Sequence, residues 1–130
     1  EYFMGATAYS PQFAGLMPAV AQVEKIFKTK TGGVPFDGDS IQEAVAMLVL
    51  AQAIDKAGSL DPDKVAKTLH ANTWESPLSL GGKVAFQKGG QNKLAKSILT
   101  QIQKNEYKRI YPEKMSDSTI VLPMRPWAKR

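Results

Sequence analysis

Residues 38–58 read GDSIQEAVAMLVLAQAIDKAG, and this stretch has the marks of a long helix with a defined start and end. Ser40 followed three residues later by Glu43 has the form of a capping box, which satisfies backbone N–H groups at a helix start. Positions 44–51 are all apolar, so apolar side chains surround most of the predicted helix. Gly58 stands where a left-handed C-terminal cap is common. The stretch therefore predicts a helix buried between layers rather than one lying on a surface.

The segments on either side of this stretch predict two more helices. Asp61 followed by Pro62 indicates an N-cap with proline in the first turn, and Leu60 and Val65 have the spacing of a hydrophobic staple. Upstream, apolar residues recur every three or four positions between residues 12 and 31, which indicates an amphipathic helix. Pro18 interrupts that pattern, so either the helix is kinked there or its regular part begins there.

Strands are predicted towards both ends of the chain. Residues 1–9 contain few helix or strand breakers and suit a buried strand, which Ser10 and Pro11 end. Residues 97–103 and 106–111 are two short runs separated by Lys104 and Asn105, which indicates a β-hairpin. Residues 73–90 are irregular apart from a strand candidate at 83–86. The chain is therefore expected to be of mixed α/β class.

The composition excludes several classes of protein. At 130 residues, with 43% hydrophobic and 22% charged residues, the chain is long enough for a real core. It has no cysteine, which excludes disulfides, thiolate metal sites and a cysteine nucleophile. No apolar run approaches the roughly 20 residues that a membrane helix needs. The chain begins without Met in what reads as a strand, so we expect a fragment or a processed product whose signal peptide is removed or absent.

The net charge of +5 leaves one alternative function open. The basic excess is concentrated in residues 83–114 and at positions 125, 129 and 130. A small basic module that binds a polyanion such as nucleic acid would carry such a cluster. The chain has no arginine-rich run and no named nucleic-acid signature, so a solvated surface is the preferred interpretation.

Candidates for chemistry are few. His70 is the single histidine, so the chain cannot complete a catalytic triad or a multi-histidine metal site. The loop before the long helix is the remaining candidate, because a helix start presents unpaired N–H groups while Asp37 and Asp39 add carboxylates. The alternative is that Asp39 or Ser40 merely caps the helix.

Four stretches together resemble a known family. They are EAVAMLVLAQAIDKAGSLDPDKVAKTL at residues 43–69, GGKVAFQKGGQN at 81–92, the predicted hairpin ending in Ile110-Tyr111-Pro112, and the tail LPMRPWAKR at 122–130. Their order and spacing resemble the C-terminal third of a type I periplasmic solute-binding protein, of the group that includes the leucine/isoleucine/valine-binding proteins of bacterial ABC importers. The resemblance spans nearly the whole chain. It departs from the family at Gln42-Glu43, where many members have Tyr-Asp, and at Phe86-Gln87, where an acidic residue usually follows the phenylalanine.

The resemblance implies a portion of a fold with two Rossmann-like lobes joined by three crossings, in which helices pack on a sheet and a C-terminal β-hairpin follows. It assigns residues 1–11 to a strand and hinge crossing of the second lobe, 12–112 to the C-terminal part of the first lobe, and 113–130 to a hinge crossing and terminal tail. The loop before the long helix would then face the cleft. The ligand-binding candidates are Asp37, Asp39, Ser40 and Tyr9.

The implied function is that of a periplasmic or otherwise extracytoplasmic receptor. It would capture a small amino acid or related organic acid between two lobes and deliver it to the membrane permease of an ABC importer, without catalysis, metal or cofactor. The rest of the same polypeptide or a second chain would complete the fold, and nucleic acid is not among the expected partners.

Overall fold

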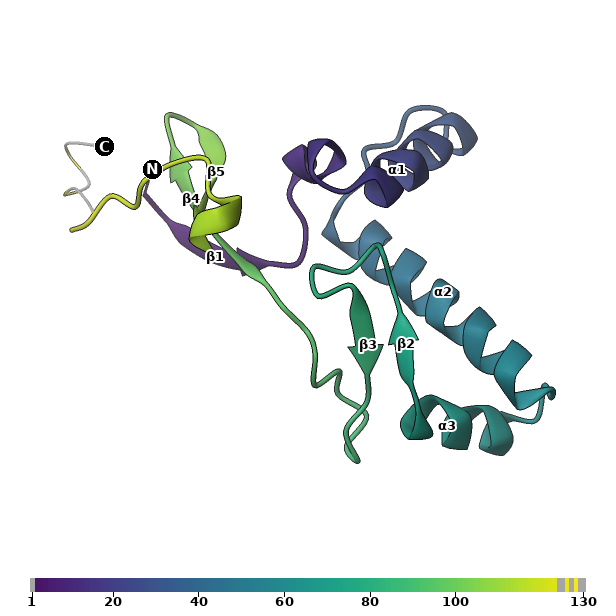
Figure 1. The fold of residues 1–130 in the computed structure, drawn as a ribbon. Coiled ribbons are helices and arrows are strands. Elements are labelled where there is room, and N and C mark those ends of the chain that lie inside the picture. The colour runs from purple at the N-terminus through teal and green to yellow at the C-terminus, as the bar shows by residue number, and fades with distance from the viewer. Residues whose placement is uncertain (1, 124–125, 127, 129–130) are drawn as a thin grey trace. The chain divides into compact units, whose positions relative to one another are not determined.

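The computed structural model describes residues 2–123, 126 and 128, and it divides into two compact units. The helical unit is Pro11–Lys96, and the strand unit consists of the described residues of Glu1–Ser10 and Ser97–Arg130 (Figure 1). Glu1 of the first predicted strand lies outside the described residues, as do Trp127 and the basic positions 125, 129 and 130 of the tail. The assignment of residues 1–11, 12–112 and 113–130 to lobes and crossings stays a prediction.

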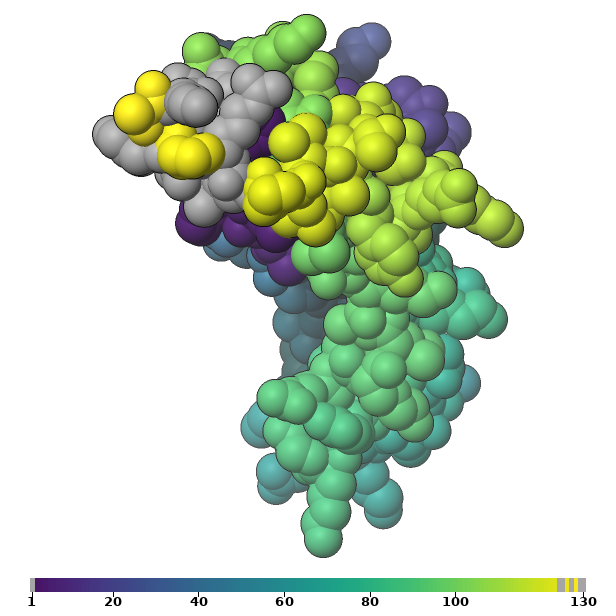
Figure 2. All heavy atoms as spheres, turned by 90° about the vertical axis from the view of Figure 1, so that its left-hand side faces the viewer, coloured from purple at the N-terminus to yellow at the C-terminus, as the bar shows by residue number. Residues whose placement is uncertain are grey.

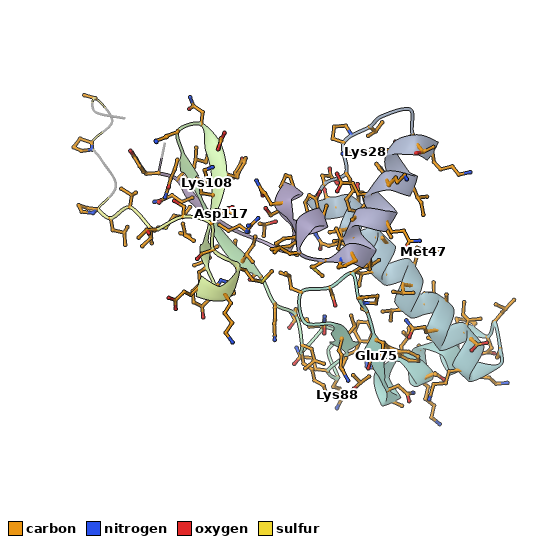
Figure 3. The ribbon with its side chains drawn as sticks, turned by 45° about the horizontal axis from the view of Figure 1, so that its top comes forward. Lys28, Met47, Glu75, Lys88, Lys108 and Asp117 are labelled. Carbon is orange, nitrogen blue, oxygen red and sulfur yellow. The ribbon has the colours of Figure 1, made fainter. Side chains whose placement is uncertain are left out.

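The predicted long helix is present as α2, Gly38–Ala57. It ends as expected, because Gly58 adopts the left-handed conformation with φ 58°. Its burial differs from the expectation: Ile41, Val49 and Ala53 are buried, but Met47 (labelled in Figure 3) is 66% exposed. The prediction of a helix buried between layers is therefore not met within the described residues, where one side of α2 is exposed. Within the helical unit, α3 and β2 contact α2 through one part of its surface and leave another part bare.

The first helix resolves the question that Pro18 raised. A 3-10 helix at Pro11–Gly15 is followed by α1, Pro18–Lys30, so the regular helix begins at the proline. Proline suits this place because the first N–H groups of a helix have no intrahelical partner. The aromatic ring of Phe27 in α1 meets that of Phe36 edge-on, with the centroids 5.3 Å apart. This contact anchors the loop that leads into α2.

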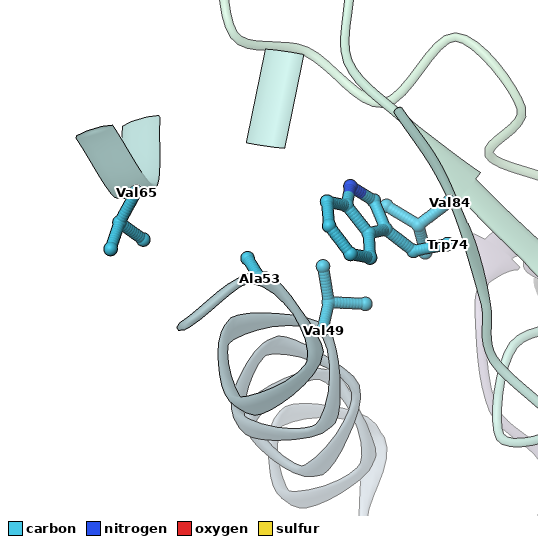
Figure 4. Close-up of a cluster of buried hydrophobic side chains, with 5 residues drawn as sticks. All are labelled: Val49, Ala53, Val65, Trp74 and Val84. Carbon is cyan, nitrogen blue, oxygen red and sulfur yellow. The ribbon is translucent and has the colours of Figure 1, made fainter. Parts of the chain in front are cut away.

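The core of the helical unit lies where α2 meets α3 and a small sheet. Helix α3 is Pro62–Ala71, and Asp61 caps it as predicted by accepting hydrogen bonds from the N–H groups of Asp63 and Lys64. Strands β2, Thr73–Glu75, and β3, Lys83–Ala85, pair antiparallel. Figure 4 shows the cluster that joins these elements. Its members are Val49, Ala53, Val65, Trp74 and Val84.

Trp74 is the largest side chain of this cluster, and the sequence did not predict its strand. It is 4% exposed, and its indole Nε1–H donates a hydrogen bond to the carbonyl of Leu69 at 3.1 Å. The predicted irregular segment 73–90 therefore contains β2 as well as the expected strand near 83–86. Leu60, by contrast, is 82% exposed, although its spacing to Val65 predicts a hydrophobic staple.

The strand unit is a three-stranded antiparallel sheet in the order β1-β4-β5. Strand β1 is Met4–Thr7, β4 is Ile98–Gln103 and β5 is Glu106–Tyr111. The predicted hairpin is confirmed, because Lys104 and Asn105 connect β4 to β5 with φ values of 55° and 62°, as a tight hairpin turn requires. Strand β1 is shorter and more exposed than expected, since it forms one edge of the sheet and Met4 is 42% exposed.

Two glutamine side chains attach the segment after β5 to β4. The side chain of Gln101 accepts a hydrogen bond from the N–H of Val121 at 2.9 Å and donates one to the carbonyl of Val121 at 3.1 Å. Gln103 donates to Gln101 at 2.8 Å and to the carbonyl of Thr119 at 2.8 Å. In Figure 2 the yellow-green and yellow atoms of the residues after β5 lie over the green atoms of the hairpin. Side-chain amides thus provide the hydrogen bonds that a further strand would make with its backbone.

Arg109 joins β5 to the same following segment. It is 7% exposed, its guanidinium lies 3.2 Å from the carboxylate of Asp117, and its Nε donates to the carbonyl of Met115 at 2.7 Å. In sequence, the 3-10 helix Glu113–Met115 lies between Arg109 and Asp117, and Met115 is its last residue. Burying a guanidinium group costs desolvation free energy, and several hydrogen-bond and ion-pair partners offset more of that cost than a single partner does.

The expected α/β class and the packing of helices on a sheet are confirmed, with every strand pairing in the described residues antiparallel. These elements are consistent with a portion of a periplasmic-binding-protein fold. None of the helices in the described part of the chain has the length and apolar content that a membrane span needs.

Candidate functional site

The start of α2 is built around Asp37. Its Oδ1 accepts hydrogen bonds from the N–H of Ser40 at 2.8 Å and from the Ser40 hydroxyl at 2.7 Å. These hydrogen bonds favour the ionised carboxylate, so they hold the pKa of Asp37 below its ordinary value. Asp37 is therefore the N-cap, and the predicted capping by Asp39 or Ser40 is corrected. The physical reason is register: the helix begins at Gly38, which places Ser40 inside the first turn.

Asp39 lies in the first turn of α2 with its side chain exposed. In the part of the chain that the structure describes, its carboxylate has no hydrogen bond or ion pair. Ser40 is half-buried and donates to Asp37. The structure thus brings Asp37, Asp39 and Ser40 together at one helix start, with one carboxylate engaged and the other open to solvent.

Tyr9 belongs to the strand unit, whereas the helix start belongs to the helical unit, and its part in a binding site stays a prediction. It follows β1 and is 7% exposed. Its N–H donates to the Thr7 hydroxyl at 3.2 Å, and that hydroxyl donates to the Tyr9 carbonyl at 3.1 Å.

The residues that the structure describes contain no candidate metal site. No group of three or more His, Asp or Glu side chains there is placed to hold a metal ion. His70 is exposed and its ring lies 6.1 Å from that of Phe86 in a tilted arrangement.

Several of the late basic residues are engaged with carboxylates. Lys83 lies 3.0 Å from Glu75, directly opposite it on β2, and Lys108 pairs with Glu106. The hydrogen bond between the Lys108 and Glu106 side chains, together with the attraction of their charges, raises the pKa of Lys108 and lowers that of Glu106. With Arg109 held by Asp117, part of the expected cationic surface is neutralised by neighbouring side chains.

Two curated proteins are similar to this chain. The "Leucine-, isoleucine-, valine-, threonine-, and alanine-binding protein" of Pseudomonas aeruginosa is 46% identical over 48 residues, which are 37% of this chain and 12% of that protein. The "Leu/Ile/Val-binding protein homolog 7" of Brucella suis biovar 1 is 27% identical over 107 residues, 82% of this chain and 27% of that protein. The chain resembles part of a Leu/Ile/Val-binding protein.

This similarity confirms the resemblance read from the sequence. No family model matches the chain. The match with the Brucella protein, 107 residues within 130, necessarily includes residues 24–107 and hence all of α2, α3 and both strands of the small sheet. Both relatives are named as binding proteins, and each match covers a minor part of the relative's own length.

Two features of the structure are not predictable from a local pattern in the same way as the helix start. One is the pair of glutamines on β4, whose role depends on a segment about 20 positions away and has no local signal. The other is a hollow of about 340 Å³ between α2 and α3, which is lined by apolar residues. The sequence did contain a sign of this hollow: α2 has more apolar residues than one packed face of a helix requires, so some of them must line another surface.

Proposed function

We propose that this chain is part of an extracytoplasmic solute-binding protein that captures a small amino acid or a related organic acid. The single observation that carries this proposal is the similarity to the Leu/Ile/Val-binding protein homolog of Brucella suis across 82% of the chain. The mixed helix and sheet structure supports it. In this proposal the remainder of a two-lobe protein completes the binding cleft, and the loaded protein delivers its ligand to the permease of an ABC importer.

The ligand contacts that we propose in this chain are Asp37, Asp39, Ser40 and Tyr9. An anion bound at a helix start accepts hydrogen bonds from backbone N–H groups of the first turn. Here the N–H of Ser40 already donates to the Asp37 carboxylate. The ligand group that suits this place is therefore a cation. The exposed Asp39 carboxylate is available to accept hydrogen bonds from the ammonium group of an amino acid.

Binding in such a protein needs no chemical step. A ligand that contacts both lobes has a higher affinity for the closed arrangement than for the open one, and it therefore shifts the population towards closure. The permease would then recognise the closed form. Catalytic groups and cofactors have no part in this function.

The experiment is a calorimetric titration with leucine, isoleucine, valine, threonine and alanine. It uses the protein purified from the cells that naturally make it. Asp39→Asn should weaken binding tenfold or more and leave the melting temperature unchanged, because this side chain has no structural partner. Asp55→Asn is the matched control, since Asp55 is an exposed aspartate near the other end of α2. Its affinity should equal that of the wild type.

Two results would contradict the proposal. One is the absence of binding to all five amino acids. The other is binding of a DNA duplex or heparin with an affinity that falls steeply as salt increases, which would support the polyanion-binding alternative.

A further inference from the structure

The longest part of the chain without a carboxylate begins just before β3. No Asp or Glu occurs between Glu75 and Glu106, and lysine occurs there at positions 83, 88, 93, 96 and 104. Residues 87–96, QKGGQNKLAK, follow β3 in the helical unit, and we call them the lysine loop. Every residue of this loop except Asn92 is exposed. The loop therefore presents lysine side chains to solvent without a carboxylate among them.

Hydrogen bonds give the lysine loop a defined backbone. The N–H of Lys93 donates to the carbonyl of Ala85 in β3 at 2.8 Å. The side-chain oxygen of Asn92 accepts from the N–H of Ala85 at 3.2 Å and from the N–H of Leu94 at 3.0 Å. These bonds hold the returning arm of the loop against β3, so its lysines extend from an ordered backbone.

The lysines of the loop differ from the lysine that precedes them. Lys83 lies 3.0 Å from the carboxylate of Glu75. Lys88 (labelled in Figure 3), Lys93 and Lys96 are exposed, and they form no ion pair in the part of the chain that the structure describes. An anionic surface that approaches the loop would thus meet ammonium groups that no carboxylate of the described residues neutralises.

The remaining side chains of the loop limit which anion it suits. Nucleic acids are recognised through aromatic stacking and through bidentate arginine contacts, and the loop has neither an aromatic residue nor an arginine. Trp, Tyr and Arg also supply most of the binding energy at protein interfaces, so a protein partner would find no anchor here. Lysine acts as a point charge, which suits a dense array of lipid phosphates that has no fixed geometry.

We propose that the lysine loop is a contact site for the anionic headgroups of a phospholipid surface. Leu94, 37% exposed, stands between Lys93 and Lys96 in sequence and adds apolar surface at the headgroup boundary. Each lysine contributes a modest attraction that salt screens, so the contact is weak and reversible. This inference goes beyond the proposed function, because it requires neither a bound amino acid nor the start of α2.

The test is co-sedimentation with lipid vesicles, using the protein purified from the cells that naturally make it. One vesicle preparation is phosphatidylcholine alone, and the other contains equal parts of phosphatidylcholine and phosphatidylglycerol. At low ionic strength we expect binding to the mixed vesicles to be at least tenfold tighter than to phosphatidylcholine. The difference should shrink as sodium chloride is added, because salt screens charges on exposed surfaces.

A combined variant shows whether the loop carries this binding. Lys88→Gln, Lys93→Gln and Lys96→Gln together should weaken binding to the mixed vesicles at least tenfold. The melting temperature should stay within a few degrees of the wild type, since these side chains are exposed and form no ion pair among the described residues. Unchanged vesicle binding in this variant would overturn the inference.

The matched control removes the same charge from other exposed positions. Lys25→Gln, Lys30→Gln and Lys56→Gln together change α1 and α2 and leave the loop intact. This variant should bind the mixed vesicles as the wild type does. A loss equal to that of the loop variant would show that net charge, and not the lysine loop, carries the binding.

Three further results would overturn the inference. One is equal binding to the two vesicle preparations. Another is binding of a DNA duplex or heparin that is tighter than binding to the mixed vesicles, which would support the polyanion-binding alternative. The third is displacement by inorganic phosphate that exceeds displacement by sodium chloride at equal ionic strength, which would identify a site for free phosphate. Vesicle binding without amino-acid binding would overturn the proposed function alone.

Discussion

The side-chain amide of Gln101 bonds to both backbone groups of Val121, as the neighbouring strand of a sheet would do. Gln101 is fully buried, and the same amide also donates to the carbonyl of Tyr2 at 3.3 Å. One side chain thus joins three segments that are distant in sequence. Replacing it leaves several buried polar groups without partners at once.

Gln101→Leu should therefore lower the free energy of unfolding by about 1–3 kcal/mol and speed hydrogen exchange at the Val121 N–H. Urea unfolding and amide exchange by mass spectrometry measure the two effects. Gln87→Leu is the control, because Gln87 is exposed and its side chain bonds to that of Gln91 on the surface. If both variants lose the same stability, the Gln101 contacts are not what holds the segment.

Trp74 should be the most sensitive position of the helical unit. Trp74→Ala removes the largest side chain of the core cluster, and we expect a loss of about 3–5 kcal/mol in urea unfolding. Trp74→Phe keeps an aromatic ring but removes the hydrogen bond to the Leu69 carbonyl, so its loss should be smaller. Leu60→Ala, at an 82% exposed position, should change stability by less than about 0.5 kcal/mol. A loss at Leu60 as large as that at Trp74 would refute the described core.

Asp37 should stabilise the start of α2 in a pH-dependent way. Asp37→Ala removes the cap and should lower the melting temperature by a few degrees at neutral pH. The folded-state pKa of Asp37 is lowered, so its contribution is present above the unfolded pKa of about 3.9 and is lost as pH falls through the folded value. Melting curves from pH 7 to pH 2 should therefore converge for wild type and variant at the acid end. Asp39→Ala should change the melting temperature at neutral pH less than Asp37→Ala does, and a larger effect at Asp39 than at Asp37 would reverse the assignment of the cap.

Two glycines offer a matched test of how closely the backbone at Gly81 approaches the backbone at Leu94. A Cβ added at Gly81 would lie 3.1 Å from the carbonyl oxygen of Leu94, whereas at Gly89 it would meet nothing within 4 Å. Gly81→Ala should cost about 1–3 kcal/mol, because backbone must move to make room. Gly89→Ala should be neutral or slightly stabilising, since it restricts the unfolded chain. Equal unfolding free energies for the two variants would show that residues 81 and 94 do not approach closely.

Local signals predicted the elements whose ends carry turn or capping chemistry. Asp61 with Pro62 fixed the start of α3, Gly58 marked the end of α2, and Lys104 with Asn105 marked the hairpin turn. Such signals act within four residues, so they are readable without knowledge of the rest of the fold. The start of α2 was misjudged by a few residues because Asp37, Asp39 and Ser40 are all good caps, and the choice depends on where Phe36 anchors the loop.

Non-local features were not predictable in the same way. The strand containing Trp74 is three residues long, and it exists through its pairing with β3 and its packing on α2. The exposure of Met47 depends on which elements cover α2, and apolar periodicity cannot identify them. For the candidate site, the sequence placed the helix start within a few residues of the observed one, whereas its use as a binding site and the part of Tyr9 in it stay predictions.

The antiparallel pairing of β1 with β4 has a consequence for synthesis on the ribosome. Met4 pairs with Gln101 and Thr7 with Ile98, so the whole of Pro11–Lys96 must emerge before the first strand of the chain meets its partner. The helical unit is contiguous in sequence, so all of its residues are made during that interval, before β4 is available to pair with β1. The pairing of β1 with β4 is therefore a late event that coincides with the emergence of the hairpin.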